Sequence, residues 1–145
     1  MGARRSGREA ALQILFQIEA SGAGADAAIA LFWRNFEADP EGRPYADEAV
    51  RGIAGSLAEV DASITAASSN WRIERMTRVD RNLLRLGTWE LMFRPDIPRA
   101  VVLDEAVELA KSYGTDESSA FVNGVLNQIG EKVRQNEPRR EAREE

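Results

Sequence analysis

The chain has 145 residues, of which 43% are hydrophobic and 30% charged, and this size and composition are typical of one soluble globular domain. It contains no cysteine and no histidine, which excludes disulfides and thiol nucleophiles and removes the usual general base and the commonest metal ligands, so we expect no enzyme, no metal site and no cofactor. The net charge is −5, and the absence of a long apolar run or a secretory leader predicts a cytoplasmic protein that does not contact a membrane.

The first half of the chain is predicted to form three helices. Apolar residues recur at three- and four-residue spacing, and no alternating strand pattern is visible, which favours an all-α fold. The first two helices are expected over about residues 4–20 and 26–37, separated by a Ser-Gly-Ala-Gly break. After a proline-containing loop at 39–44, one long third helix is expected, in which Gly52 and Gly55 either permit close packing of a neighbouring helix or are tolerated flaws.

Three further helices are expected in the second half, over about residues 79–93, 99–113 and 116–134. The first of them is apolar over more than half of its circumference, which predicts a central, buried helix. Glu90 lies in its apolar sector, so the carboxylate needs an arginine or backbone N–H groups as partners. Gly114 is expected to end the next helix, and Thr115 to cap the last one, with acidic residues in its first turn.

The six expected helices form two groups of three, over about residues 4–67 and 71–134. Each group has enough apolar surface for a three-helix unit, so we expect two packed three-helix bundles that form one domain over residues 1–134. Residues 135–145 have no apolar side chain larger than alanine apart from one proline, which predicts a disordered charged tail.

Two places along the chain have features that single-stranded RNA binding uses. The first turns contain Arg4, Arg5 and Arg8 and only one acidic residue. This composition indicates either a basic patch on an otherwise acidic chain or a solvated helix end without a function. Phe121 lies about 100° from the centre of the last helix's apolar stripe, and Phe16 lies at the edge of the first one. Each is either a platform on which a base stacks or an aromatic at the core margin. The pattern leaves RNA binding, peptide binding and a scaffold role open.

Four segments resemble the second half of the NusB family in order and spacing. They are VDRNLLRLGTWEL at 79–91, DIP at 96–98, DEAVELAKSYG at 104–114 and FVNGVL at 121–126. The opening arginines and the following REAALQ also resemble the family's arginine-rich start, and the likeness extends over about residues 4–134.

The resemblance implies two three-helix bundles and a role in processive transcription of ribosomal RNA operons. Members of the family bind boxA RNA together with NusE, a ribosomal protein, in an antitermination complex on RNA polymerase. The resemblance therefore implies RNA contacts, for which the candidates are Arg4, Arg5, Arg8, Phe16, Glu117 and Phe121. It places contacts with the ribosomal protein at Asp80 and Arg85, which otherwise form surface ion pairs.

Two features depart from the family's pattern. Ser6 and Gly7 interrupt the basic run, which predicts weak RNA affinity without the partner protein. Phe16 stands where a tyrosine-like aromatic is expected, so it can stack but cannot donate a hydrogen bond.

Other functions remain open at this point. NusB-like domains also occur as RNA-binding parts of ribosomal RNA methyltransferases, although this chain has no glycine-rich nucleotide-binding loop after a strand. A helical protein–protein adaptor without RNA contact is the third candidate. The sequence also leaves open whether the chain forms a homodimer.

Overall fold

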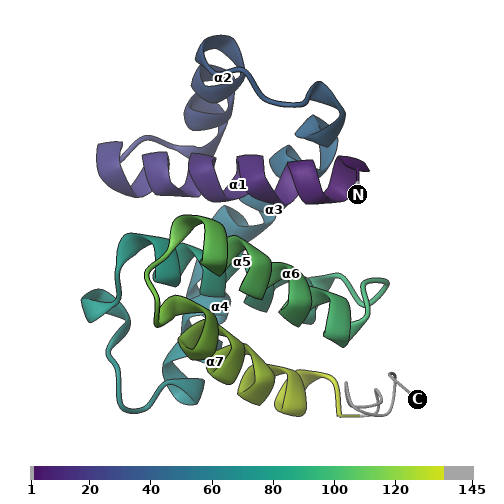
Figure 1. Ribbon diagram of the computed structural model, residues 1–145. Coiled ribbons are helices and arrows are strands. Elements are labelled where there is room, and N and C mark those ends of the chain that lie inside the picture. The colour runs from purple at the N-terminus through teal and green to yellow at the C-terminus, as the bar shows by residue number, and fades with distance from the viewer. Residues whose placement is uncertain (1, 136–145) are drawn as a thin grey trace. The chain divides into compact units, whose positions relative to one another are not determined.

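The computed structural model describes residues 2–135, and within this range the chain forms helices and their connections without strands (Figure 1). The α-helices are α1 (Gly2–Ser21), α2 (Ala25–Asn35), α3 (Arg43–Gly55), α4 (Leu57–Ala67), α5 (Arg78–Phe93), α6 (Arg99–Tyr113) and α7 (Ser118–Val133), and two 3-10 turns are η1 (Pro40–Gly42) and η2 (Ile73–Arg75). The predicted all-α fold is confirmed. The tail predicted over residues 135–145 lies outside the described residues from position 136 onward.

The third expected helix is two helices, so the prediction of one long helix is wrong. Ser56 leaves the helical conformation at φ −126° and ψ 26°, and its N–H donates to the carbonyls of Gly52 at 3.0 Å and Ile53 at 3.2 Å, which closes α3. Glycine in a helix interior costs about 1 kcal/mol relative to alanine, so the pair Gly52 and Gly55 weakens the helix at this point. A Cβ on Gly55 would meet nothing within 4 Å, which excludes close packing as the reason for that glycine.

The chain divides into two compact units after Leu57. The sequence pattern predicts a division between residues 67 and 71, whereas the structure divides next to the break between α3 and α4, at the first residue of α4. The arrangement of the two units as one domain stays a prediction.

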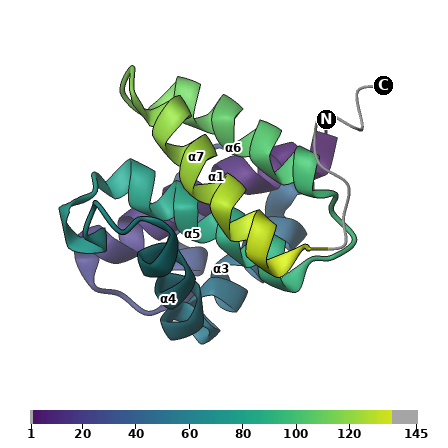
Figure 2. The same cartoon turned by 90° about the horizontal axis from the view of Figure 1, so that it is seen from below.

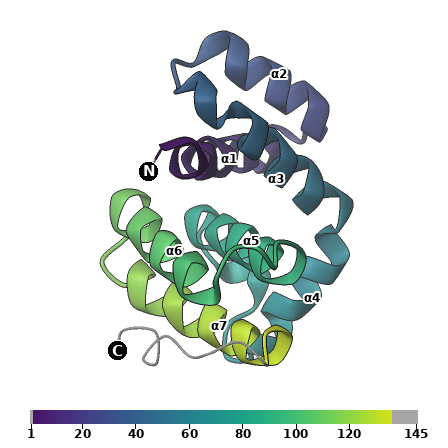
Figure 3. The same cartoon turned by 90° about the vertical axis from the view of Figure 1, so that its right-hand side faces the viewer.

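In the first unit, α1, α2 and α3 pack together, as Figure 3 shows. Ala11, Ile14 and Val50 are fully buried in this core. The turn η1 lies directly against the start of α1, because a Cβ on Gly42 would come within 2.6 Å of the N atom of Gly7. Glycine at both positions is what allows this approach.

In the second unit, α5, α6 and α7 pack against one another, and Figure 2 shows α7 lying along the other two. Nine of the sixteen residues of α5 are buried, more than in any other helix of the described chain, so the prediction of a central helix is confirmed. A Cβ on Gly87 would lie 2.6 Å from Leu126 Cδ1, so α5 and α7 approach closely at this glycine. Glu90 is buried as predicted, with 1% of its surface exposed.

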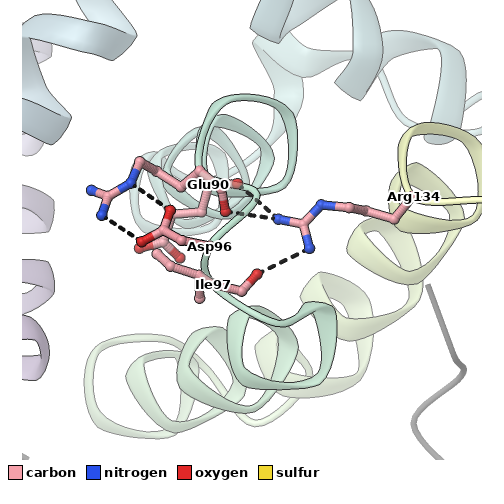
Figure 4. Close-up of polar contacts among 5 residues, drawn as sticks. Glu90, Asp96, Ile97 and Arg134 are labelled. Carbon is pink, nitrogen blue, oxygen red and sulfur yellow. Dashed lines mark hydrogen bonds and ion pairs between the residues drawn. The ribbon is translucent and has the colours of Figure 1, made fainter. Parts of the chain in front are cut away.

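Arg134, directly after α7, ties the end of the second unit together (Figure 4). Its guanidinium is buried and donates to four main-chain oxygens, those of Leu91 at 2.9 Å, Ile97 at 2.9 Å, Arg94 at 3.0 Å and Glu90 at 3.1 Å. These oxygens lie at the end of α5 and in the turn that leads to α6, where a cation is favoured by the helix dipole. The Glu90 and Arg94 oxygens also accept the main-chain N–H groups of Arg94 and Ile97, both at 3.0 Å. One side chain thus holds α7 against the α5–α6 turn.

The turn between α6 and α7 differs from the prediction. Helix α6 ends at Gly114 as expected, but α7 begins at Ser118, with Glu117 at its N-cap position and no side-chain capping bond. Thr115 therefore does not cap α7 with its hydroxyl. Instead its main-chain N–H donates to Ser118 Oγ at 2.9 Å. The acidic residues expected in the first turn of the helix lie before it, in the turn.

No single helix within residues 2–135 is long and apolar enough to cross a membrane, although α1 and α2, bent by 119°, pass this test of length and composition when taken together.

Candidate nucleic-acid interface

The arginines at the start of α1 have different environments. Arg4 and Arg5 are exposed, whereas Arg8 is only 3% exposed. The guanidinium carbons of Arg4 and Arg8 lie 5.4 Å and 5.8 Å from the centroid of the Tyr45 ring, a distance at which a cation is attracted to an aromatic face. The start of α1 thus presents two arginines to solvent, while Arg8 joins α1 to α3 through Tyr45.

The break in the basic run, at Ser6 and Gly7, has a packing reason. Ser6 Oγ donates to Asp39 Oδ2 at 3.2 Å, and a Cβ on Gly7 would lie 2.9 Å from the carbonyl oxygen of Gly42. Asp39 also accepts the N–H of Glu41 at 3.0 Å and caps η1. Two small residues between the arginines are therefore needed where η1 packs on α1, which the sequence pattern did not indicate.

Phe16 is half-buried on α1, as expected for a residue at the edge of the apolar stripe. It follows Arg5 by eleven positions and shares its side of the helix, but at 1.5 Å rise per residue the two lie about 16 Å apart along the axis. The structure therefore does not place them close enough to contact the same nucleotide.

Phe121 is half-buried on the first turns of α7, so its predicted partial exposure is confirmed. Its N–H donates to the Glu117 carbonyl at 3.1 Å, which places it one helical turn after Glu117. The Glu117 side chain is exposed, and its Oε1 accepts a long hydrogen bond of 3.4 Å from Thr115 Oγ1. The start of α7 thus carries an aromatic ring and, one turn earlier, an exposed carboxylate. Such a carboxylate can accept a hydrogen bond from the amino group of a base.

Trp71 lies beside Phe121, and sequence reasoning missed it. The two ring centroids are 6.3 Å apart with an interplanar angle of 75°, an edge-to-face arrangement. Trp71 follows α4 in a segment without helical periodicity, and this position outside any apolar stripe was the only signal in the sequence.

The two residues expected to contact a ribosomal protein differ in their bonding. Arg85 makes a two-pronged ion pair with Asp61 of α4, with Nε–Oδ1 at 2.9 Å and Nη2–Oδ2 at 3.0 Å, and both side chains are largely covered. Asp80 is half-buried in the first turn of α5, where its N–H donates to Thr77 Oγ1 at 3.1 Å. At 100° per residue the two side chains lie about 140° apart around α5, so the helix does not bring them together.

One carboxylate that follows Trp71 by three residues, Glu74, has a shifted pKa. The pKa of Glu74 is lowered by a hydrogen bond from its own main-chain N–H and by the positive charge of Arg72. Glu74 Oε1 lies 3.5 Å from Arg72 Nε, and both side chains are mostly exposed, so this ion pair contributes little to stability.

Comparisons with known proteins agree with one another. The sequence profile of the NusB family matches residues 5–131. The transcription antitermination protein NusB of Sorangium cellulosum is 65% identical over 133 residues, which cover 92% of this chain and 95% of that protein. A structure of T. maritima NusB is 35% identical with a TM-score of 0.78, covering 98% of this chain and 97% of the other. A crystal structure of the antitermination factors NusB and NusE in complex with dsRNA contains a chain that is 28% identical with a TM-score of 0.78, covering 90% of this chain and 98% of that one.

Proposed function

We propose that this chain, which belongs to the NusB family, is an RNA-binding transcription antitermination factor. In this role it binds boxA RNA of ribosomal RNA operons together with the ribosomal protein NusE, and promotes processive transcription within the antitermination complex on RNA polymerase. The observation that carries the proposal is the 65% identity to a NusB protein of nearly the same extent, since 95% of that relative is covered. The similarity is thus to a whole NusB protein and not to one part of a methyltransferase.

Phosphate binding is assigned to Arg4 and Arg5, because their guanidinium groups are exposed at the start of α1. Arg8 is assigned a supporting role, since it is buried and lies over Tyr45, and a phosphate contact would require it to leave that ring. Phosphate contacts supply affinity and position the RNA but do not read its sequence.

Base contacts are assigned to the start of α7 and, secondarily, to Phe16. Phe121 supplies a stacking face, and Glu117 an acceptor for base amino groups. Phe16 has the partial exposure that stacking requires, at a separate point along α1.

The contact with NusE is assigned to Asp80 on the first turn of α5. Arg85 supports this part of the second unit through its ion pair with Asp61 and is a weaker candidate for direct contact. We further propose that the protein acts by assembly and not by catalysis, and that it works in the cytoplasm, where bacterial transcription takes place.

Binding of a boxA oligonucleotide to the purified chain, with and without NusE, tests the proposal. We expect tighter binding when NusE is present, and we expect Phe121→Ala to weaken binding by roughly fivefold or more, as loss of one stacked base does. Phe36→Ala is the matched control, because Phe36 is 48% exposed directly after α2, in the first unit, and is assigned no RNA contact. Failure of the wild-type chain to bind in either condition would favour a protein–protein adaptor without RNA contact.

A further inference from the structure

Trp71 is the most exposed large apolar side chain within residues 2–135, with 54% of its surface accessible. Burial of a tryptophan contributes more to folding than burial of most side chains, and at Trp71 about half of that surface stays exposed. Single exposed apolar residues are common on protein surfaces, however, so exposure alone does not define a site.

The main chain around Trp71 is held in place without help from its ring. Its N–H donates to the Ser68 carbonyl at 2.9 Å. The Ser68 side chain is buried, and its hydroxyl oxygen lies 2.7 Å from the Ile64 carbonyl oxygen and 3.3 Å from that of Trp71, so its single hydrogen is donated chiefly to Ile64. The backbone of Trp71 is thus fixed to the end of α4, and the indole projects from a preorganised turn.

The geometry of Trp71 and Phe121 suits a flat ligand. The planes of the two rings meet at 75° with their centroids 6.3 Å apart, and Trp71 is 54% exposed, so a ring face of Trp71 is accessible next to Phe121. A planar group that lies flat against one ring presents its edge to the other, which satisfies both the stacked and the edge-to-face preferences of aromatic groups. The indole N–H has no hydrogen-bond partner among residues 2–135, and it is a donor only, so it suits an acceptor atom on the edge of a base.

Charged residues that neighbour Trp71 and Phe121 along the chain match a nucleotide. Arg72 follows Trp71 directly, is 77% exposed and is held only by the loose pair with Glu74, so it is available to a phosphate. Glu117 lies one turn before Phe121 and offers its carboxylate to base amino groups. A phosphate-binding cation, two ring faces, a donor and an acceptor are all present in the second unit.

We propose that Trp71 and Phe121 together hold one unpaired RNA base, with Trp71 as a base-binding residue beside the predicted Phe121. This inference rests on the proposed RNA-binding function and adds to it the claim that a single base contacts both rings. The ligand is a nucleotide in single-stranded RNA, since a base paired within a helix does not expose its faces for stacking on a protein.

The test combines affinity with the fluorescence of Trp71. The chain has three tryptophans, and the other two are less exposed than Trp71. Trp33 is half-buried with its Nε1 bonded to Asp47 at 2.9 Å, and Trp89 is 4% exposed. We expect boxA RNA to quench the fluorescence of the wild-type chain. In Trp71→Phe most of this quenching should disappear while RNA binds nearly as tightly, because the ring face is retained. Trp71→Ala should weaken binding by roughly fivefold or more.

Phe93→Ala is the matched control, since Phe93 is 40% exposed in the same unit and belongs to no proposed contact. Thermal unfolding of each variant shows whether the fold is intact. If Trp71→Ala binds like the wild type while Phe121→Ala binds weakly, the role of Trp71 is refuted and the RNA-binding function stands. If Trp71→Ala binds weakly but the quenching persists in Trp71→Phe, the effect is structural and the inference is also refuted. If the wild-type chain does not bind RNA, both the function and the inference fail.

Discussion

Arginines at the start of the first unit and at the end of the second have opposite environments. Arg4 and Arg5 are exposed on the first turn of α1, whereas Arg134 after α7 is buried and bonded to four main-chain oxygens. An exposed guanidinium can exchange water for a phosphate, while a buried one that satisfies carbonyls contributes to folding. The role of an arginine near a helix end is therefore set by the oxygens around it, so substitutions should separate stability from RNA affinity.

The largest effect on stability is expected from Arg134→Met. The change removes a buried cation and leaves carbonyl groups of Leu91 and Ile97 without their charged donor, so we expect the free energy of unfolding to fall by about 3 kcal/mol. Urea denaturation measures it. Lys132→Met is the control, since Lys132 is exposed on the last turn of α7. Equal midpoints for the two variants would show that Arg134 does not hold the α5–α6 turn.

A smaller loss is expected from Arg85→Met. The ion pair with Asp61 is two-pronged but only partly buried, so we expect a loss of about 1–2 kcal/mol in unfolding free energy. Binding of NusE, measured by calorimetry at a temperature where both proteins are folded, should change little. A normal stability combined with lost NusE binding would instead make Arg85 a direct contact.

The smallest loss of stability is expected from Arg8→Met. Arg8 belongs to the basic start of α1 but is buried over Tyr45, so we expect about 1 kcal/mol of lost stability from the missing cation–π contact. The salt dependence of RNA binding should remain that of the wild type. A shallower dependence with unchanged stability would mean that Arg8 leaves Tyr45 and binds a phosphate.

Helix positions were predictable where local residues mark both ends. Helix α6 runs over Arg99–Tyr113 as expected, because Pro98 precedes it and Gly114 follows it. The break at Ser56 was missed because the apolar spacing continues through it, from Ile53 to Val60 and Ile64. Apolar spacing along the sequence does not show where one helix ends and the next begins in a new direction. Here the low helix propensity of Gly52 and Gly55 was the better guide.

The candidate site was predictable only in part. The azimuth of Phe121 on α7 was enough to predict its partial exposure. The burial of Arg8 depends on Tyr45, which lies on another helix, and Trp71 meets Phe121 across fifty positions of sequence. Contacts between residues so far apart leave no trace in local periodicity. The role of Arg134 was missed for the same reason, since a single arginine after a helix resembles a solvated one.

The salt dependence of RNA binding by Arg4→Gln/Arg5→Gln tests the central claim most directly. Arg43→Gln/Arg51→Gln is the matched control, because both of these arginines are about half exposed on α3 and the net charge changes equally. Affinity for a boxA oligonucleotide would be measured by fluorescence anisotropy over a range of salt concentrations. For the variant in α1, we predict weaker binding and a slope shallower by about 0.7 for each lost phosphate contact. The unfolding free energy should fall by no more than about 0.5–1 kcal/mol, because the exposed Arg4 loses its contact with the Tyr45 ring. The same slope and affinity in wild type, variant and control would contradict the assignment of the start of α1 to RNA.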